Sequence, residues 1–334
     1  MKKVIITGIY GQDGSFLCEL LSKKGYHIFG VAKKQLSANS VRIKRELDSK
    51  KIVINLFDIN LYDYHEVSTF IEQVQPDEIY HMAAYHASAE GKGNLAALRE
   101  QEVFNKNVLA TANILESCHY LSKTVRIVTA GSCLMFDASN TQCQTEETPF
   151  ESKSLYGMAK ITENTLVQYY RKKGLYACTA ILYNHESHRR GSQFVTKKIV
   201  ENMVRIKQGE IQSFTLGALD VEKDWGYAGD YVEAMWLMLQ AASPKDYIVA
   251  TGELHSIYEF VNICANILGI DEWEKHVIED SSIINRKIQG RLKGNSRAIR
   301  QELSWHMSKN FEEIVEEMVD NEKFVDYSSE NRLK

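Results

Sequence analysis

The first half of the chain alternates short apolar segments, rich in β-branched residues, with longer segments in which apolar residues recur at helical spacing. The apolar segments include VIIT at 4–7, IYHM at 79–82 and VRIVTA at 125–130. Continuous apolar runs of this length, separated by helical stretches, are typical of parallel strands that are covered on both faces. The pattern therefore predicts an α/β fold built on a doubly wound parallel sheet.

A glycine-rich loop, TGIYGQDGS at 7–15, joins the first apolar segment to the first helical one. Glycines let a backbone turn tightly and approach a pyrophosphate, which then lies at the positive end of the following helix. Between a strand and a helix this spacing is typical of dinucleotide binding, although a glycine trio elsewhere is often an ordinary turn. We expect the loop to contact a cofactor through Gly8, Tyr10, Gly11, Gln12, Asp13 and Gly14.

The residues after the second apolar segment bear on which nicotinamide cofactor binds. A free ribose 2′-hydroxyl usually meets an aspartate or glutamate at this position, but this chain has Lys33 and Lys34. Two cations suit a 2′-phosphate, so the sequence favours NADP(H), with NAD(H) as the open alternative. Asp58, at the end of the third apolar segment, is placed to contact the adenine, or it caps a turn.

Composition argues against several other classes of protein. The net charge of −4 and the scattered basic residues do not suit a nucleic-acid-binding surface. No apolar run is long enough to cross a membrane. The six cysteines form no CxxC pair and no His/Cys spacing that would hold a metal, so we expect reduced thiols in a cytoplasmic protein.

The alternating pattern becomes less regular beyond about residue 183. We expect residues 1–183 to form an NADP-binding domain of the Rossmann type, to which some later segments return. Residues 184–334 are expected to form mainly a smaller substrate domain. The expected site is the cleft between them, at the carboxyl ends of the strands.

Tyr156 and Lys160 lie four residues apart at the start of a helical pattern, so they share one face of a helix. An ammonium beside a tyrosine lowers the pKa of the phenol, and the phenolate can take a hydroxyl proton while hydride leaves the same carbon. Ser132, after the preceding apolar segment, offers a hydroxyl that can orient that oxygen. With the glycine loop, these residues resemble the extended short-chain dehydrogenase/reductase family, which implies that Ser132, Tyr156 and Lys160 are catalytic and that Tyr156 and Lys160 contact the cofactor.

Three longer strings narrow the resemblance: GQDGSFLCELLSKKGY at 11–26, ILYNHESHRRGSQFVTKKI at 181–199 and LGALDVEKDWGYAGDYVEAMWLMLQ at 216–240 are similar to GDP-mannose 4,6-dehydratases. The resemblance covers most of the chain and implies NADP(H), a GDP-sugar bound in the smaller domain, and a homodimer or homotetramer. In such assemblies the loop at 33–42 would reach a neighbour's cofactor. The resemblance also implies that four further residues contact the cofactor: Ala83, Ala84, Tyr85 and Asn107. The residues that it implies at the substrate are Ser132, Cys133, Leu134, Asn184, Glu186, Lys198, Lys223 and Arg286.

Two of these positions depart from the pattern of the resembled family. Lys223 stands where the family has an arginine, so the charge is kept but the bidentate fork is lost. The KIQG that follows Arg286 also differs from the usual proline-containing string. Taken alone, each of the charged substrate positions would more often be a surface salt bridge.

The residue that carries out elimination in the resembled family is missing. A 4,6-dehydratase oxidises C4, eliminates water across C5 and C6, and returns hydride to C6. Elimination needs a base for the C5 proton and an acid for the departing hydroxyl, and the resemblance assigns this work to a glutamate where this chain has Leu134. Leucine has no proton to give or take, so we expect oxidation at C4 without efficient dehydration.

Two nearby residues are candidates to replace the glutamate. In an extended segment Cys133 would point away from the sugar if Ser132 faces it. His86 lies in a loop that borders the site in the resembled family, and a histidine near its ordinary pKa can act as a base. A lone loop histidine is, however, more often an ordinary polar contact.

Four functions stay open from the sequence. The leading one is oxidation of C4 in a GDP-hexose or GDP-heptose by Tyr156, Lys160 and Ser132. The others are a true dehydratase with a substitute base such as His86, a 4-epimerase that needs the same three residues, and a catalytically silent partner that only binds cofactor and GDP-sugar. The intact catalytic trio speaks against the last.

Overall fold

The structure is a computed structural model of the whole chain, in which residues 1–85, 94–137, 143–280 and 291–325 are described. Seven parallel strands form the central sheet in the order β11-β6-β5-β4-β1-β2-β3. Their bounds are β1 Lys3–Thr7, β2 His27–Val31, β3 Ile54–Phe57, β4 Glu78–His81, β5 Arg126–Ala130, β6 Tyr176–Leu182 and β11 Tyr247–Val249. This arrangement confirms the predicted doubly wound α/β fold.

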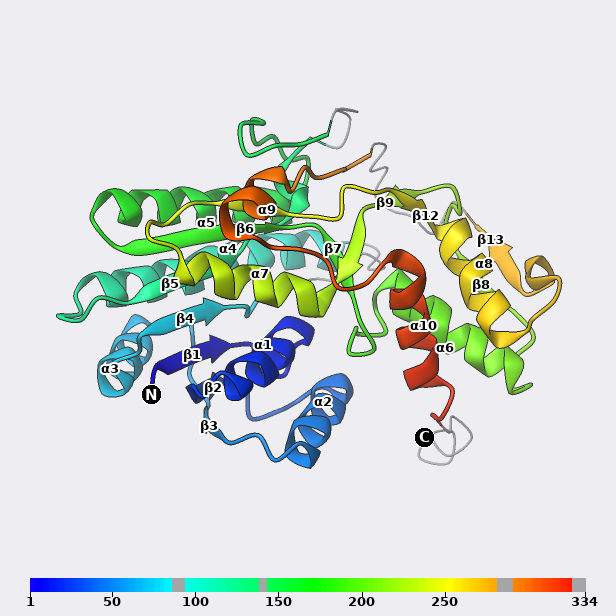
Figure 1. Cartoon of the computed structure of the whole chain (residues 1–334), viewed down its shortest axis with the longest axis horizontal. Helices are drawn as coiled ribbons and strands as arrows, with labels where there is room; N and C mark the ends of the chain where they lie inside the picture. The colour runs from blue at the N-terminus through cyan, green and yellow to red at the C-terminus, as the bar shows by residue number, and fades with distance from the viewer. Residues whose placement is uncertain (86–93, 138–142, 281–290, 326–334) are drawn as a thin grey trace.

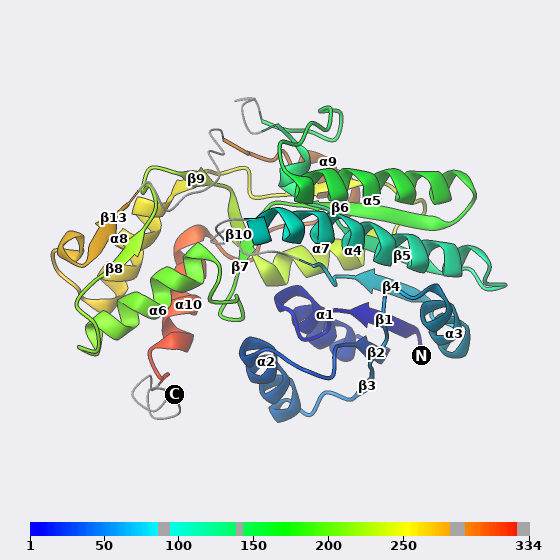
Figure 2. The same ribbon diagram turned by 180° about the vertical axis from the view of Figure 1, so that it is seen from behind.

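Helices cover both faces of the sheet, as Figures 1 and 2 show. One face packs on α1 (Gln12–Lys23), α2 (Ala38–Ser49), α7 (Ala228–Gln240) and α9 (Arg297–Leu303). The other packs on α3 (Tyr64–Val74), α4 (Asn94–His119) and α5 (Leu155–Lys172). Neighbouring residues of β1 divide between the two cores, because Val4 and Ile6 face the first group of helices and Ile5 faces the second.

A third core lies beyond the end of the sheet, at the right of Figure 1. It is built by α6 (Val195–Lys207), α8 (Ile257–Leu268) and α10 (Phe311–Glu322), and the rings of Trp225 and Phe311 stack at 5.8 Å within it. Short strand pairs surround it: β7 (Asn184–Glu186) with β10 (Trp225–Tyr227), β9 (Glu222–Lys223) with β12 (His255–Ser256), and β8 (Phe214–Leu216) with β13 (Val277–Glu279). Two 3-10 turns, η1 (Cys133–Met135) and η2 (Trp273–Lys275), complete the described elements. No helix in the described ranges is both long and apolar enough to cross a membrane.

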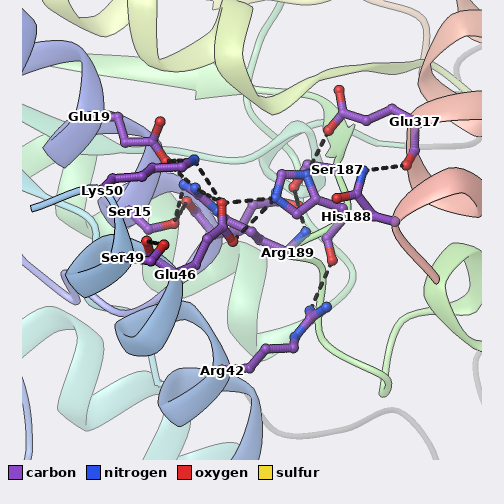
Figure 3. A network of polar contacts seen from close by, with 12 residues as sticks. Ser15, Glu19, Arg42, Glu46, Ser49, Lys50, Ser187, His188, Arg189 and Glu317 are labelled. Carbon is purple, nitrogen blue, oxygen red and sulfur yellow. Dashed lines mark hydrogen bonds and ion pairs between the residues drawn. The ribbon is translucent and has the colours of Figure 1, made fainter. Parts of the chain in front are cut away.

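A polar network joins this third core to the sheet domain (Figure 3). Arg189, in the loop after β7, has a side chain only 1% exposed, and its guanidinium binds Glu19 of α1 and Glu46 of α2. The neighbouring His188 lies 3.3 Å from Glu46 and 2.7 Å from Glu317 of α10. A buried guanidinium is tolerated only when it is paired, so these contacts fix the loop against three helices.

Candidate active site

A cavity of about 660 Å³ opens at the carboxyl ends of the central strands. The residues that line it lie at or after the ends of β1 (8 and 10–14), β4 (82 and 84), β5 (130–134) and β6 (182–183), and at the start of β7 (184–185). The loop after β7 and the start of α2 close its other sides. In a parallel sheet these strand ends lie side by side, which brings side chains that are far apart in the sequence into one cavity.

The glycine loop after β1 fits a pyrophosphate. Gly8 has a φ of +69° and a Cβ there would lie 3.0 Å from the backbone of Ala83, while a Cβ on Gly14 would lie 2.3 Å from the Gly8 carbonyl oxygen. Larger residues would therefore push the turn apart. Gly11 caps α1 without a side-chain hydrogen bond, so the first amides of the helix have no side-chain cap. Free amides at the positive end of a helix are a ready anion site.

Gln12 and Asp13 line the cavity but also bind the segment that begins the smaller core. Gln12 Nε2 donates to the His185 carbonyl oxygen at 3.0 Å, and Ser187 Oγ donates to Gln12 Oε1 at 2.9 Å. Asp13 Oδ1 lies 2.9 Å from His185 Nε2, and His185 Nδ1 lies 2.7 Å from the Tyr183 carbonyl oxygen. Both ring nitrogens thus face acceptors, which suits an imidazolium. Burial opposes the charge, but the Asp13 carboxylate raises the pKa of His185 above its usual range.

The residues assigned to the adenosine end lie outside this lining. Lys34 Nζ is 3.9 Å from Asp58 Oδ2, and the two side chains are 89% and 41% exposed. Such an exposed pair is weak. Lys33 is exposed as well, and the start of α2, at 38–40, lines the cavity instead. Arg42 ends the segment 33–42, which was expected to reach the cofactor of a neighbouring subunit. Within the same chain, Arg42 donates a hydrogen bond to the His188 carbonyl oxygen at 2.9 Å.

The remaining cofactor candidates lie close to the glycine loop or support it. Ala84 lines the cavity and Ala83 forms the wall against which Gly8 packs. Asn107 of α4 accepts a hydrogen bond from the Tyr85 amide at 2.8 Å and donates to the Tyr85 carbonyl oxygen at 2.8 Å. Asn107 therefore fixes the backbone after β4.

Tyr156, Lys160 and Ser132 all line the cavity. Ser154 begins α5 by accepting a hydrogen bond from the Gly157 amide at 3.1 Å, which satisfies a free donor of the first helical turn. Lys160 Nζ lies 5.8 Å from the centre of the Tyr156 ring. The sequence predicted that this lysine lowers the pKa of the tyrosine. Lys160 does lower the pKa of Tyr156, but burial of the phenol raises it by more, so the net pKa is raised rather than lowered.

The segment after Ser132 is a turn rather than an extended strand, which corrects the prediction for Cys133. Ser132 Oγ accepts a hydrogen bond from the Leu134 amide at 3.2 Å, and the Met135 amide donates to the Ser132 carbonyl oxygen at 3.0 Å. In the resulting 3-10 turn strict alternation does not apply: Cys133 is among the lining residues together with Ser132 and Leu134, and its side chain is buried in the core. Burial raises the pKa of the Cys133 thiol to about 11, so it is a poor base near neutral pH.

Carboxylates are scarce in this cavity. Of the described residues that line it, only Asp13 carries one, and that group is bound by His185. Asp137, the next acidic residue after Leu134, lies 2.9 Å from Lys153 Nζ and is not part of the lining. His86, the proposed substitute base, falls outside the described residues.

The substrate candidates divide into two groups. Asn184 and Lys223 line the cavity, whereas Glu186 and Lys198 do not. Glu186 is buried, accepts a hydrogen bond from Thr196 Oγ1 at 2.6 Å, and lies 3.1 Å from Arg190 Nε. Arg286 lies outside the described residues.

Arg190 is a cavity-lining cation that the sequence reasoning missed. Its guanidinium lies 3.6 Å from the centre of the Phe194 ring, and Glu186 holds it from the other side. The HRRG string that carries it offered a signal, but nothing in that string indicates that Arg189 is bound in the buried network while Arg190, which also lines the cavity, is the more exposed of the two.

Comparison with known sequences places the chain in a family. The sequence profile of GDP-mannose 4,6 dehydratase matches residues 5–318. GDP-mannose 4,6 dehydratase 1 of Arabidopsis thaliana is 36% identical over 332 residues, which cover 96% of this chain and 90% of that protein. The GDP-mannose 4,6 dehydratase of Homo sapiens is 34% identical over 350 residues, covering 94% of this chain and 90% of that protein.

Solved structures with low sequence identity share the fold. The dTDP-glucose 4,6-dehydratase from Bacillus anthracis, in complex with NAD, has a TM-score of 0.79 at 17% identity and covers 96% of both chains. The UDP-glucuronic acid 4-epimerase from Bacillus cereus, in complex with UDP-glucuronic acid and NAD, has a TM-score of 0.80 at 16% identity and covers 96% of this chain and 99% of that one. The sequence matches go further than fold: the chain belongs to the GDP-mannose 4,6-dehydratase family and is an NAD(P)-dependent sugar-nucleotide oxidoreductase.

Proposed function

We propose that this protein oxidises C4 of a GDP-hexose or GDP-heptose to the 4-keto sugar, without efficient loss of water. One observation carries the proposal. Tyr156, Lys160 and Ser132 line a cavity in which the only carboxylate among the described lining residues, that of Asp13, is bound by His185. The side chains needed for oxidation are present together, and the group needed for elimination is not among them.

The chemistry asked of the side chains is a proton transfer. The Tyr156 phenolate accepts the proton of the C4 hydroxyl, and Ser132 donates a hydrogen bond to the C4 oxygen. The C4–H bond breaks in the same step, and its hydrogen leaves with the electron pair. A nicotinamide cofactor bound along the glycine loop supplies the acceptor for that hydride. The sugar thereby loses two hydrogens and keeps all its oxygens.

The ionisation of Tyr156 gives this proposal a pH dependence. Oxidation needs the phenolate, and burial raises the pKa of Tyr156 above its usual value of 10. The fraction of phenolate therefore grows as the pH rises through the neutral range. We expect kcat for C4 oxidation to rise toward alkaline pH for as long as the protein stays folded.

Polar and charged residues of the cavity lining suggest which groups contact the sugar nucleotide. We propose that Asn184 faces the sugar and that Lys223 and Arg190 face the diphosphate, because all three line the cavity.

NADP(H) remains the favoured cofactor on the basis of Lys33 and Lys34. The variant K33A/K34A should weaken binding of NADP⁺ at least tenfold and leave binding of NAD⁺ within twofold. A preference for NAD⁺ in the unaltered protein would reject this part of the proposal.

We also propose that the protein forms a homodimer or a larger homo-oligomer in the cytoplasm. Leu155, Met158 and Tyr169 form one exposed stripe of α5, and Leu109 is exposed on the neighbouring α4. Exposed apolar stripes of this kind mark interaction surfaces. The six cysteines are free thiols, which agrees with a reducing compartment.

The experiment that tests the function is to add GDP-hexoses and GDP-heptoses to enzyme loaded with oxidised cofactor and to follow the absorbance of the reduced cofactor. Net oxidation predicts that reduced cofactor accumulates up to one equivalent per site. A 4,6-dehydratase and a 4-epimerase both return the hydride to the sugar. Product formation without accumulation of reduced cofactor would therefore reject the proposal.

A further inference from the structure

The ammonium of Lys160 is bound by a second residue of the same helix, which the sequence reasoning did not single out. Glu163 follows Lys160 by three residues on α5, and its Oε2 atom lies 3.1 Å from Lys160 Nζ. Both residues are only 3% exposed. A charge pair at this depth is screened little by solvent, so each partner has a strong effect on the groups around it.

The Glu163 carboxylate is held from a second helix as well. Thr111 Oγ1 of α4 donates a hydrogen bond to Glu163 Oε2 at 2.9 Å. The other carboxylate oxygen, Oε1, is buried and has no hydrogen-bond partner among the described residues. A buried oxygen without a donor is costly. Packing against α4 thus holds the carboxylate beside Lys160 although one of its oxygens is unsatisfied.

The position of Glu163 changes the electrostatic environment of Tyr156. After burial, the Lys160 ammonium is the main influence on the Tyr156 phenol and lowers its pKa, whereas the Glu163 carboxylate raises it. The Cys133 thiol of η1 raises that pKa further, and Arg190 lowers it. From β4, His81 faces Lys160, and burial together with Lys160 lowers the pKa of His81 to about 3, so His81 is neutral near neutral pH.

We propose that Glu163 is a positioning residue of the reaction, whose carboxylate tethers the Lys160 ammonium and cancels part of the positive field that Lys160 exerts on Tyr156. This inference rests on the proposed role of Tyr156 as the acid and base at C4. Its consequence is that the phenol keeps its proton over a wider pH range than a lone lysine would allow. Tyr156 is then able to return a proton to the C4 oxygen as well as to take one.

The test is a spectroscopic titration of Tyr156 in enzyme that holds neither substrate nor cofactor. Phenolate absorbance is recorded as the pH is raised, and the same curve from the matching Y156F variant is subtracted. In E163Q the Tyr156 transition should move to lower pH by about one unit, because a neighbouring negative charge has been removed. An unmoved transition would overturn the proposal.

Two controls separate charge from packing. In E116Q the same charge is removed from a carboxylate of α4 that accepts a hydrogen bond from Tyr170 and does not line the cavity, so the Tyr156 transition should stay in place. E163D keeps the charge and should leave the transition near that of the unaltered enzyme. A shift in E163D as large as that in E163Q would show that packing rather than charge is responsible, and would overturn the proposal.

A second comparison covers the case in which E163Q does not fold. In the K160M background the ammonium that pairs with Glu163 is gone, so K160M/E163Q replaces an uncompensated carboxylate with a neutral group. Its Tyr156 transition should lie below that of K160M, and equal transitions would contradict the inference. Because the titration uses no substrate, its result does not depend on whether the protein oxidises C4, and a failure of the proposed function would leave it unchanged.

Discussion

The two ends of the cavity are built in different ways. At the cofactor end the glycine loop follows β1, Ser132 follows β5 and Tyr156 lies in the first turn of α5, so these groups meet at the carboxyl ends of strands of one parallel sheet. At the end proposed to hold the sugar, the lining comes from β7, β9 and the loop after β7, and in the proposed function Leu134 stands in place of the residue that carries out elimination. We infer that the sheet fixes the residues proposed for oxidation, whereas the proposed sugar end is assembled from short segments in which one substitution can change the reaction.

The largest expected effect lies at the cofactor end. In Y156F the acid and base is lost while the ring remains, so kcat for C4 oxidation should fall by about a hundredfold to ten-thousandfold. The rate is measured by the absorbance of the reduced cofactor, and unchanged cofactor affinity serves as the control. Oxidation at the full rate in Y156F would show that Tyr156 is not the acid and base at C4, and that the proposed difference between the two ends of the cavity is wrong.

Restoring a carboxylate at the sugar end should give the next effect. L134E places a group that can transfer protons at a position that lines the cavity. We expect the rate of water loss to rise by about a hundredfold or more, as one general base typically contributes. L134Q has a similar shape but cannot transfer the proton, so its product should remain the 4-keto sugar with all its oxygens. If L134E forms the ketone but loses no more water than L134Q, the leucine does not account for the missing elimination.

The polar network around Arg189, which joins the third core to the central sheet, is predicted to stabilise the fold. R189M removes the buried guanidinium and leaves Lys50 as the bridge between Glu19 and Glu46, with His188 also in contact with Glu46. The free energy of unfolding should fall by about 2 kcal/mol, less than for a fully buried pair because both glutamates are partly exposed. Urea unfolding measures it. The matched control is K44A, which breaks an exposed pair with Asp48 and should change stability by less than about 0.5 kcal/mol. Equal losses in the two variants would show that the network is not a structural joint.

The smallest effect distinguishes two lysines of the sugar end. Lys223 lines the cavity and Lys198 does not. K223A should raise KM for the GDP-sugar about tenfold, the loss expected for one charge-assisted contact, and K198A should raise it less than threefold. Initial rates at saturating cofactor measure both. The reverse order would mean that the substrate diphosphate lies nearer α6 than the cavity lining indicates.

The sequence predicted the features that short-range patterns control. The strand, glycine loop and helix at 3–23 follow from periodicity and from the steric demands of Gly8 and Gly14. Tyr156 and Lys160 share a face because their spacing is that of one helical turn. The carboxyl ends of parallel strands then bring these groups together whatever the details of packing.

Features that depend on contacts between distant segments could not be predicted in this way. The bond from Gln12 to the residue at 185 spans 173 positions, and no local pattern indicates it. In the sequence, Glu163 cannot be told from an ordinary polar residue of a helix, because its burial depends on packing against α4. The sequence predicted an extended segment after Ser132, whereas the Ser132 hydroxyl stabilises a turn there.

We have proposed that the cavity oxidises C4 and does not eliminate water. This proposal is tested most directly by the mass of the sugar nucleotide after pure enzyme has been incubated with oxidised cofactor and a panel of GDP-hexoses and GDP-heptoses. The account predicts a product lighter by two hydrogens. A product lighter by one water would contradict it, because dehydration would then proceed with a leucine, Leu134, at the position where the proposal places the missing acid and base.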